Sequence, residues 1–445
     1  MPRRHVRVSP PDDAAIAASF ALLREQLEVA LEFPPEVVED AERSIRAPRL
    51  PEDDETAIPF VTIDPPDSMD LDQALHLERL DAGYRVRYAI ADVAAFVDPG
   101  GPMDVEAHRR GQTLYAPDAN ARLYPPQLSE GGASLLPDQV RPAVLWDMRL
   151  DETGEGIEVE VRRALVRSRE KLSYETVQRS LDAGSATESL ALLREVGLLR
   201  QEREVRRGGI TLPIPEQVVE RTDGHYGLAF RAPLPVEGWN AQISLMAGQA
   251  AAELMLGAHV GVLRTLPKAD EASLDKLRRA AAGLHVEWPA GMTYPDFIRT
   301  LDPELPAHAG VGAEYAHTTA PLRRLVDRYV GEVCLAVSAG NEVPGWAHDA
   351  LPALPETMER SNGRAQQFES GIVSAVEAAV LATRVGEVFD AVVVDLHERG
   401  GATVQLREPA VLARCRGDDL TLGEELQVRL VEADVMRRVV RFEPA

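Results

Sequence analysis

The sequence has few of the residues that mark a disulfide-rich, zinc-binding or membrane protein. Only two cysteines occur in 445 residues, Cys334 and Cys415, and their separation matches no metal-ligand spacing. No run of about 18 apolar residues is present, so no transmembrane helix and no membrane partner are expected. The start, Met-Pro-Arg-Arg-His, lacks the apolar stretch of a signal peptide. Together these absences predict a protein of the reducing cytoplasm.

Positive charge is also scarce. Lys and Arg number 48 against 72 Asp and Glu, which gives a formal net charge of −24. Taken alone, this balance argues against a nucleic-acid-binding protein, because phosphate contacts need positive charge on the protein. The arginines are clustered, however, at 162–169, 200–207 and 323–328. The clusters are either solvated helix faces balanced by nearby Glu, or parts of a positive groove within an acidic surface.

Acidic residues gather most densely between positions 62 and 75. Four carboxylates lie within nine residues, directly after an apolar, strand-like run: Asp64, Asp67, Asp70 and Asp72. Two carboxylates about 5 Å apart repel each other by roughly 3 kcal/mol at an effective dielectric constant of about 20. A fold that brings them together needs protons or a cation to offset that repulsion. Carboxylate clusters suit Mg²⁺ or Mn²⁺, which catalyse reactions of phosphates.

The hydrophobic spacing predicts an α+β protein with three regions. Residues 1–55 are expected to form a small helical N-terminal domain and linker, either a helix–turn–helix or a helical cap, interrupted at Pro34-Pro35. Residues 56–384 mix hairpin patterns, at 75–89 and 218–230, with helix patterns such as the long apolar run 239–263, which predicts a large α/β domain. Five short strands in residues 385–445 predict a small closed barrel of the OB type. Such barrels commonly bind single-stranded nucleic acid.

Four motifs in order along the chain carry a family resemblance. The segment Thr-Ile-Asp-x₅-Asp-x-Asp, residues 62–72, resembles the signature of the ribonuclease II, or RNB, family of exoribonucleases. Ile-Ala-Asp-Val at 90–93, Leu-Tyr-Ala-Pro at 114–117 and Tyr-Ala-His-Thr-Thr-Ala-Pro-Leu-Arg-Arg at 315–324 are similar to further motifs of that family. The C-terminal barrel is similar to its S1 domain. The resemblance covers about residues 56–445, with the RNB catalytic domain before the barrel.

The resemblance implies a monomeric, processive 3′→5′ exoribonuclease that hydrolyses single-stranded RNA to 5′-nucleoside monophosphates. Mg²⁺, or Mn²⁺, is the implied cofactor. Asp64, Asp70 and Asp72 match catalytic metal ligands of the family. Arg323 matches its catalytic arginine, and a guanidinium suits this role because it can hold a phosphate and neutralise developing charge. Tyr115 matches the tyrosine that packs against the terminal nucleotide.

Three more residues are candidates for RNA contact. Glu369 aligns with a family glutamate near the RNA 3′ end. Arg324 either contacts a phosphate or pairs with Asp327. His317 either contacts the substrate or is a buried, hydrogen-bonded histidine.

Two positions depart from the family pattern. Gln73 stands where the family usually has a fourth catalytic Asp, and a Gln offers a metal a carbonyl oxygen but no charge. The extra carboxylate of Asp67 could compensate. The N-terminal helices replace the cold-shock barrels typical of the family. Two alternatives therefore stay open: a catalytically impaired RNA-binding protein of the same fold, and a metal-dependent phosphoesterase that acts on small substrates.

Overall fold

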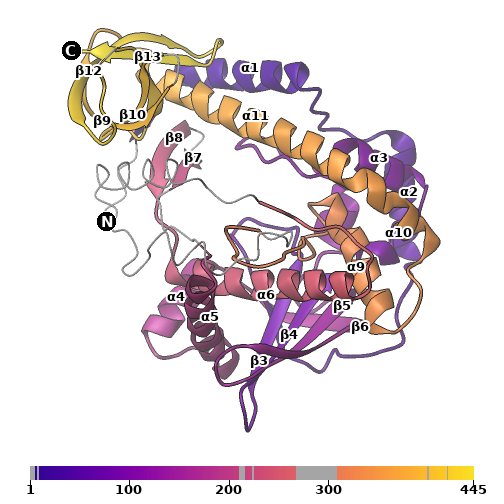
Figure 1. Ribbon diagram of the computed structural model, residues 1–445. Helices are drawn as coiled ribbons and strands as arrows, with labels where there is room; N and C mark the ends of the chain where they lie inside the picture. Colours follow the sequence, from indigo (N-terminus) through magenta and orange to yellow (C-terminus); the bar gives the residue numbers. More distant parts are fainter. Residues whose placement is uncertain are drawn as a thin grey trace.

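The computed structural model describes residues 6–7, 10–209, 216–222, 225–266, 308–397, 400–417 and 419–445. Two closed five-stranded β-barrels dominate the described part of the chain. The long helix α11 (Leu354–Leu381) leads from the larger, mixed α/β part into the C-terminal barrel, as Figure 1 shows. The predicted α+β class with helices at the N-terminus is confirmed.

The first barrel lies in the predicted α/β region. Its strands are, in spatial order, β2 (Phe60–Ile63), β3 (Gln73–Arg79), β4 (Tyr84–Ala91), β5 (Val140–Leu150) and β6 (Gly156–Leu172). The alternation of apolar and polar residues predicted the β3–β4 hairpin, and the observed pairing runs from Gln73 opposite Ile90 to Arg79 opposite Tyr84. The barrel closes because β2 pairs in parallel with the end of β6. This closure brings the residues after β2 next to the end of β6.

Helices and short turns surround this barrel. They are η1 (Val93–Ala95), α3 (Pro102–Arg110), η2 (Leu128–Gly132), α4 (Tyr174–Asp182), α5 (Glu188–Arg206), α6 (Pro235–Gly257), α9 (Leu325–Ser338), α10 (Gly345–Ala350) and η3 (Leu351–Ala353). The sequence predicted a central helix over 239–263, and α6 begins four residues earlier with Pro235 in its first turn, where a missing N–H costs nothing. Its buried residues join the core of the barrel.

The two N-terminal helices, α1 (Pro10–Gln26) and α2 (Pro35–Arg46), pack into different cores. Ile16 and Phe20 of α1 belong to the core that contains Phe368 of α11 and the C-terminal barrel, and α1 runs beside α11 in Figure 1. Val37 and Ala41 of α2 belong to the core of the first barrel. The domain division at residues 55 and 384 stays a prediction.

A small three-stranded sheet lies between the two barrels. It contains β1 (Val6–Arg7), β8 (His225–Arg231) and β7 (Glu216–Thr222) in that order. The predicted hairpin of β7 and β8 is confirmed, although its turn residues, 223–224, lie outside the described residues.

The C-terminal barrel has the order β10-β11-β13-β12-β9. Its strands are β9 (Val388–Leu396), β10 (Ala402–Leu406), β11 (Leu412–Cys415), β12 (Glu425–Asp434) and β13 (Val439–Pro444). The ring centroids of Phe389 and Phe442 lie 5.9 Å apart in its core. The predicted OB-type barrel is confirmed. In the part of the chain that the structure describes, every helix is too short or too polar to span a bilayer.

The buried carboxyl of Glu377 links α11 to β7 and the barrel. Its Oε1 accepts hydrogen bonds from Gln217 Nε2 and from the Leu412 N–H, both at 2.8 Å. Burial raises the pKa of Glu377 from 4.5 to about 7 despite these bonds. Because the folded state holds this proton more tightly than the unfolded chain, Glu377 should make stability fall as pH rises from about 4.5 to about 7.

Replacing Glu377 with Gln should remove that dependence. The stability of Glu377→Gln relative to the wild type should rise between pH 4.5 and pH 7 by an amount on the order of 3 kcal/mol, since one pKa unit corresponds to about 1.4 kcal/mol. Urea denaturation at pH 4.5 and pH 8 measures the difference. Glu356→Gln, at an exposed position of the same helix, is the control and should show no such trend. An equal pH trend for both variants would contradict the assignment.

Candidate active site

The acidic loop between β2 and β3 is fixed by contacts at both ends. The Asp64 N–H donates to the Leu172 carbonyl (3.0 Å), directly after β2 ends. Lys171 Nζ donates to the carbonyls of Pro66 and Ser68 at 2.6 and 2.5 Å. Toward the other end of the loop Leu71 is buried. The loop therefore holds its acidic side chains in a defined place.

Asp64 lies at the start of this loop with one oxygen unsatisfied. Its Oδ2 is buried and has no hydrogen-bond partner among the residues that the structure describes. Burial and the neighbouring charge of Asp70 raise the pKa of Asp64 to about 6, although Lys171 and Arg323 oppose the shift. The carboxylate of Asp64 is thus unfavourable in its charged form, and a cation would stabilise it.

Asp72 is the most buried of the four aspartates at 64–72, at 3% exposure. Its Oδ1 accepts the Leu322 N–H (2.7 Å), and its Oδ2 lies 3.4 Å from Arg323 Nε. Burial raises the pKa of Asp72 to about 8, and the charge of Asp70 adds to the rise, whereas Arg323 and the Leu322 N–H oppose it. The structure thereby brings together the aspartates and the arginine that the sequence singled out.

Tyr115 stands at the exposed edge of this cluster. Its hydroxyl donates to Asp70 Oδ2 (3.0 Å), while 42% of the residue remains exposed. The Thr113 N–H donates to the Arg323 carbonyl (2.9 Å), which holds the segment of Tyr115 alongside the segment of Arg323. The aromatic ring is therefore available at the mouth of the acidic cluster. Asp67, by contrast, is exposed within the loop.

The motif at 315–324 is positioned by α6 and α9. The Ala316 N–H donates to the Gly248 carbonyl (3.0 Å), and a Cβ at Gly248 would lie 2.2 Å from the Tyr315 ring. Only a glycine at this position of α6 allows so close an approach. The motif then passes Asp72 and enters α9 at Leu325.

Gln73 is bound to protein at both ends of its carboxamide. Its Oε1 accepts the Tyr88 hydroxyl (2.7 Å), and its Nε2 donates to the Thr319 carbonyl (2.7 Å). Tyr88 is fully buried and also lies 2.7 Å from Ser244 Oγ of α6. Gln73 thus connects β3 to the 315–324 motif. Its assignment as a metal ligand stays a prediction.

The neighbouring arginines of the motif differ in their surroundings. Arg324 donates two hydrogen bonds to Asp327, at 3.0 and 2.8 Å. Asp327 is 1% exposed and also accepts the Ala320 N–H. Although burial acts in the opposite direction, Arg324 holds the pKa of Asp327 below its usual value. The structure shows the pair of Arg324 with Asp327, and a contact of Arg324 with RNA stays a prediction.

His317 lies along a separate cavity of about 620 Å³, and Glu369 lies further along α11. His317 lines this cavity together with Asn362 and Gln366 of α11. Burial, followed by the charge of Arg324, lowers the pKa of His317 to about 3, so its ring is neutral at neutral pH. Glu369 is exposed and stands three residues after Gln366, on the same face of α11. No hydrogen bond of the described residues connects Glu369 to the aspartate cluster.

The aspartate cluster fits a divalent cation in its chemistry. Its oxygens are hard ligands, Asp64 has a buried oxygen without a partner, and burial raises the pKa of both Asp64 and Asp72. In the described ranges, no three His, Cys, Asp or Glu side chains already form a metal cage. Mg²⁺ commonly binds through one or two carboxylates and completes its coordination with water and substrate phosphate. The residues therefore fit a cation that is bound together with a phosphate.

Several residues of the site were not found from the sequence. In the sequence Lys171 stands only at the end of a run of basic residues from Arg162, and its position beside the loop follows from the pairing of Lys171 with Thr62 in the barrel. Tyr88 and Ser244 lie in none of the sequence motifs. For Asn362 and Gln366, the helical spacing relative to Glu369 was a usable signal.

Comparisons with known proteins agree with this fold. Residues 53–338 match the RNB domain family, and residues 387–445 match the RNase II-type exonuclease C-terminal S1 domain. Ribonuclease R 1 of Lactococcus lactis is 23% identical over 94% of this chain. The chain spans about 60% of the length of the curated relatives it matches first.

Solved structures show the same fold. RNase R of Mycoplasma genitalium in its apo form superimposes with a TM-score of 0.82 at 19% identity, covering 97% of this chain and 78% of that chain. Yeast Ssd1, described as a pseudonuclease, gives a TM-score of 0.65 at 16% identity, covering 95% of this chain and 58% of that chain. The family match covers more than half of the chain, and the motifs lie where the site requires them. The protein belongs to the RNB family and ends in an RNase II-type S1 domain.

Proposed function

We propose that this protein is a metal-dependent, processive 3′→5′ exoribonuclease that releases 5′-nucleoside monophosphates from single-stranded RNA. The observation that carries the proposal is the convergence of three aspartates on Arg323 beside the exposed ring of Tyr115. Structures of Mycoplasma genitalium RNase R with ribose methylated single-stranded RNA and with double-stranded RNA support RNA as the substrate class. The two free, buried cysteines agree with a cytoplasmic protein, and we propose that it acts as a monomer.

In this proposal Tyr115 and Arg323 hold the RNA terminus. The ring of Tyr115 stacks on the terminal base, which contributes about 1–3 kcal/mol per base and tolerates any base. The side chain of Arg323 is 40% exposed, so it can hold a phosphate oxygen while its Nε remains near Asp72. A guanidinium at this position stabilises the negative charge that develops on the phosphate.

The aspartates hold the metal in this proposal. Asp64, Asp70 and Asp72 would bind Mg²⁺, or Mn²⁺, with the Gln73 carbonyl oxygen as the weakest candidate, since that oxygen already accepts the Tyr88 hydroxyl. The bound cation supplies activation of the attacking water and stabilisation of the departing 3′ oxygen. The contacts of Asp72 with the Leu322 N–H and Arg323 fix the orientation of its carboxylate in the proposed metal site.

The cavity beside α11 is the proposed path for the preceding nucleotides. It is lined by the amide side chains of Asn362 and Gln366 and by the neutral ring of His317. Arg324 supports this path by ordering the 315–324 motif through Asp327 and has no direct RNA contact in our proposal. Glu369 continues the same face of the helix and would contact RNA hydroxyls, because a carboxylate accepts hydrogen bonds and repels phosphate.

Degradation of 5′-labelled single-stranded RNA tests the proposal. With Mg²⁺ the label should move from full-length RNA to short oligonucleotides, unlabelled 5′-monophosphates should accumulate, and EDTA should stop the reaction. A 3′→5′ processive enzyme leaves few labelled intermediates. Full-length RNA that persists with both Mg²⁺ and Mn²⁺ would end the proposal, and a labelled mononucleotide as the first product would reverse the direction.

One alternative is supported by a specific observation: an RNA-binding protein that has lost catalysis. Gln73 replaces a usual aspartate, and yeast Ssd1 shows that a pseudonuclease can have this fold. The hydrogen bonds of Gln73 favour a different role, because they join β3 to the 315–324 motif.

The variant Gln73→Asp separates the two possibilities. We expect it to lower the free energy of unfolding by about 1–3 kcal/mol, since the shorter side chain leaves the buried Thr319 carbonyl unpaired. We expect no increase in the rate of RNA degradation. Urea denaturation and the labelled-RNA assay measure both effects, and Gln127→Asp, at an exposed position, is the control. An inactive wild type that becomes active as Gln73→Asp would establish the RNA-binding alternative.

A further inference from the structure

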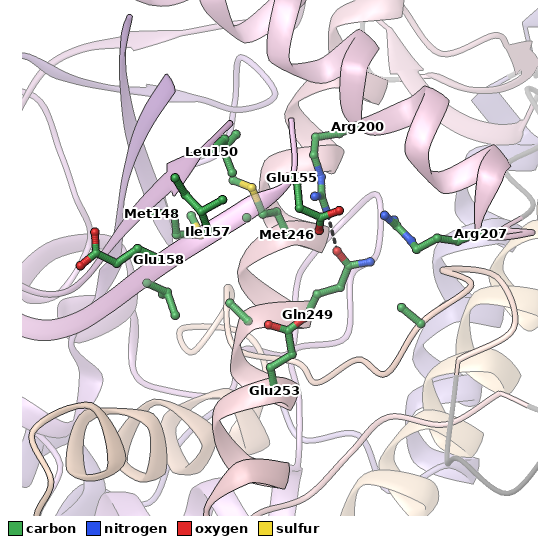
Figure 2. Close-up of a pocket in the computed structure, with 14 residues that line it drawn as sticks. Met148, Leu150, Glu155, Ile157, Glu158, Arg200, Arg207, Met246, Gln249 and Glu253 are labelled. Carbon is green, nitrogen blue, oxygen red and sulfur yellow. Dashed lines mark hydrogen bonds between the residues drawn. The ribbon is translucent and has the colours of Figure 1, made fainter. Parts of the chain in front are cut away.

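A second polar cavity, of about 270 Å³, lies between α5, α6 and the β5–β6 hairpin. Figure 2 shows the side chains that line it. One wall is apolar, with Met148, Ile157 and Met246. The other carries Arg200 and Arg207 together with the carboxylates of Glu155 and Glu253. The cavity therefore offers an apolar surface and two cations within one small space.

This cavity lies at the far end of the first barrel from the aspartate cluster. Asp72 precedes Gln73, which pairs with Ile90 at one end of the β3–β4 hairpin. Leu150, which lines the cavity, pairs with Tyr84 at the other end. Six residues of strand separate the two ends, a distance of about 20 Å. The cavity and the proposed catalytic centre share no residue.

Neither Arg200 nor Arg207 forms a close ion pair within the part of the chain that the structure describes, although the charges of Glu204 and Glu253 act on both. Arg200 is 3% exposed, donates to the Gly154 carbonyl (3.0 Å) and to Gln249 Oε1, and leaves its buried Nε without a partner. The Nε of Arg207 is also buried and has no partner within the described ranges. Arg203 and Arg206 of the same segment, in contrast, pair with Glu155 and Glu202, respectively.

Gln249 adds a third unused donor. It is 8% exposed, and its Nε2 has no hydrogen-bond partner among the described residues. In Figure 2 its carboxamide lies near the guanidinium groups of Arg200 and Arg207, and the carboxylate of Glu155 lies beside Arg200. Unpaired buried donors and cations are costly, so a site of this kind is completed by an anion that accepts hydrogen bonds. Burial and the neighbouring charge of Arg207 also lower the pKa of Arg200 to about 10, which an anion would reverse.

We propose that this cavity binds a nucleoside monophosphate. The phosphate would lie between Arg200 and Arg207 and accept from Gln249, because guanidinium groups recognise phosphate oxygens. The base would lie against the thioethers of Met148 and Met246, which pack well on aromatic rings. The volume of about 270 Å³ suits one nucleotide and excludes an RNA strand.

The identity of the ligand rests on the proposed function, since nucleoside monophosphates are the product class of that reaction. The carboxylate of Glu253, which also lines the cavity, would accept from a ribose hydroxyl or an amino group of the base. The site would thus bind the reaction product at a place remote from the proposed catalytic centre.

Calorimetry on the full-length protein in EDTA tests the inference. AMP should bind at one site per protein. The affinity for inorganic phosphate should be at least tenfold lower than that for AMP, and the affinity for adenosine should be lower still. Arg207→Met should lower the affinity for AMP at least tenfold, because it removes one of the two cations. Arg206→Met is the matched control on the adjacent residue and should bind AMP as the wild type does. Arg207 is only half-buried, so its replacement should leave the thermal unfolding midpoint nearly unchanged.

The outcomes separate this inference from the proposed function. RNA degradation without AMP binding would overturn the inference and leave the exoribonuclease intact. AMP binding that depends on Arg207 in a protein that degrades no RNA would support the site and overturn the exoribonuclease. AMP binding that Arg323→Met abolishes and Arg207→Met does not would place the nucleotide at the aspartate cluster and also overturn the inference. Equal affinity for AMP and adenosine would show that the arginines do not bind the phosphate and would overturn the inference.

Discussion

Asp72→Asn should lower the rate of RNA hydrolysis about a hundredfold to a thousandfold, the usual effect of removing one electrostatic group that acts in the transition state. RNA should remain bound, because Tyr115 and Arg323 are unchanged. Asparagine keeps an oxygen for the Leu322 N–H and removes a charge that burial disfavours, so the fold should lose no stability. Single-turnover hydrolysis and fluorescence anisotropy with labelled RNA measure the rate and the affinity separately.

Asp67→Asn is the matched control for this prediction. It makes the same chemical change in the same loop, but Asp67 is exposed. Its hydrolysis rate should stay within about threefold of the wild type, since surface substitutions have small effects. If Asp67→Asn were the inactive variant and Asp72→Asn retained full rate, the extra aspartate would be the metal ligand and the proposed assignment of Asp72 would be wrong.

Replacing the two adjacent arginines with glutamine should give opposite results. Arg323→Gln should lower the hydrolysis rate about a hundredfold or more, because the phosphate loses its guanidinium, while thermal stability changes little. Arg324→Gln should destabilise the fold by about 3–5 kcal/mol, because it leaves the buried carboxylate of Asp327 without its cation. Rates from the labelled-RNA assay and unfolding free energies from urea denaturation give the two numbers for each variant.

The contrast between neighbours is what makes this experiment decisive. A purely structural Arg323 would appear as a loss of stability that matches its loss of activity. Rescue by Arg323→Lys would be partial, since a lysine restores charge and not the planar pair of donors. A stable Arg324→Gln that binds RNA weakly would show that Arg324 contacts RNA directly.

Local sequence patterns were sufficient for most elements of the fold. The strands of the C-terminal barrel and the β3–β4 hairpin were recognisable because alternation and turn residues are properties of short segments. The boundaries were less certain. The long helix α6 begins before the predicted residue and ends at Gly257, because packing and end effects, and not hydropathy alone, set helix limits.

The alternatives that the sequence left open depended on partners far away in the chain. Arg324 was equally suited to a phosphate and to Asp327, and the turn of the chain into α9 placed Asp327 within bonding distance. The orphaned ring nitrogen of His317 and its lowered pKa follow from burial, which no local pattern reports. For Gln73 the sequence showed a missing charge, and the fold shows the Tyr88 and Thr319 contacts that it makes instead.

The sequence by itself determined the chemistry of this protein: which carboxylates, which arginine and which tyrosine are present, and in what order. Residue type and spacing suffice for that, since they are read directly along the chain. Only the tertiary structure decided which of these groups meet. Closure of the first barrel sets Lys171 beside the acidic loop, and the 315–324 motif meets Asp72 across 250 residues of intervening chain. Charges, burial and unpaired donors, including those of Arg200 and Gln249, depend on such distant neighbours and therefore appear only when the chain is folded.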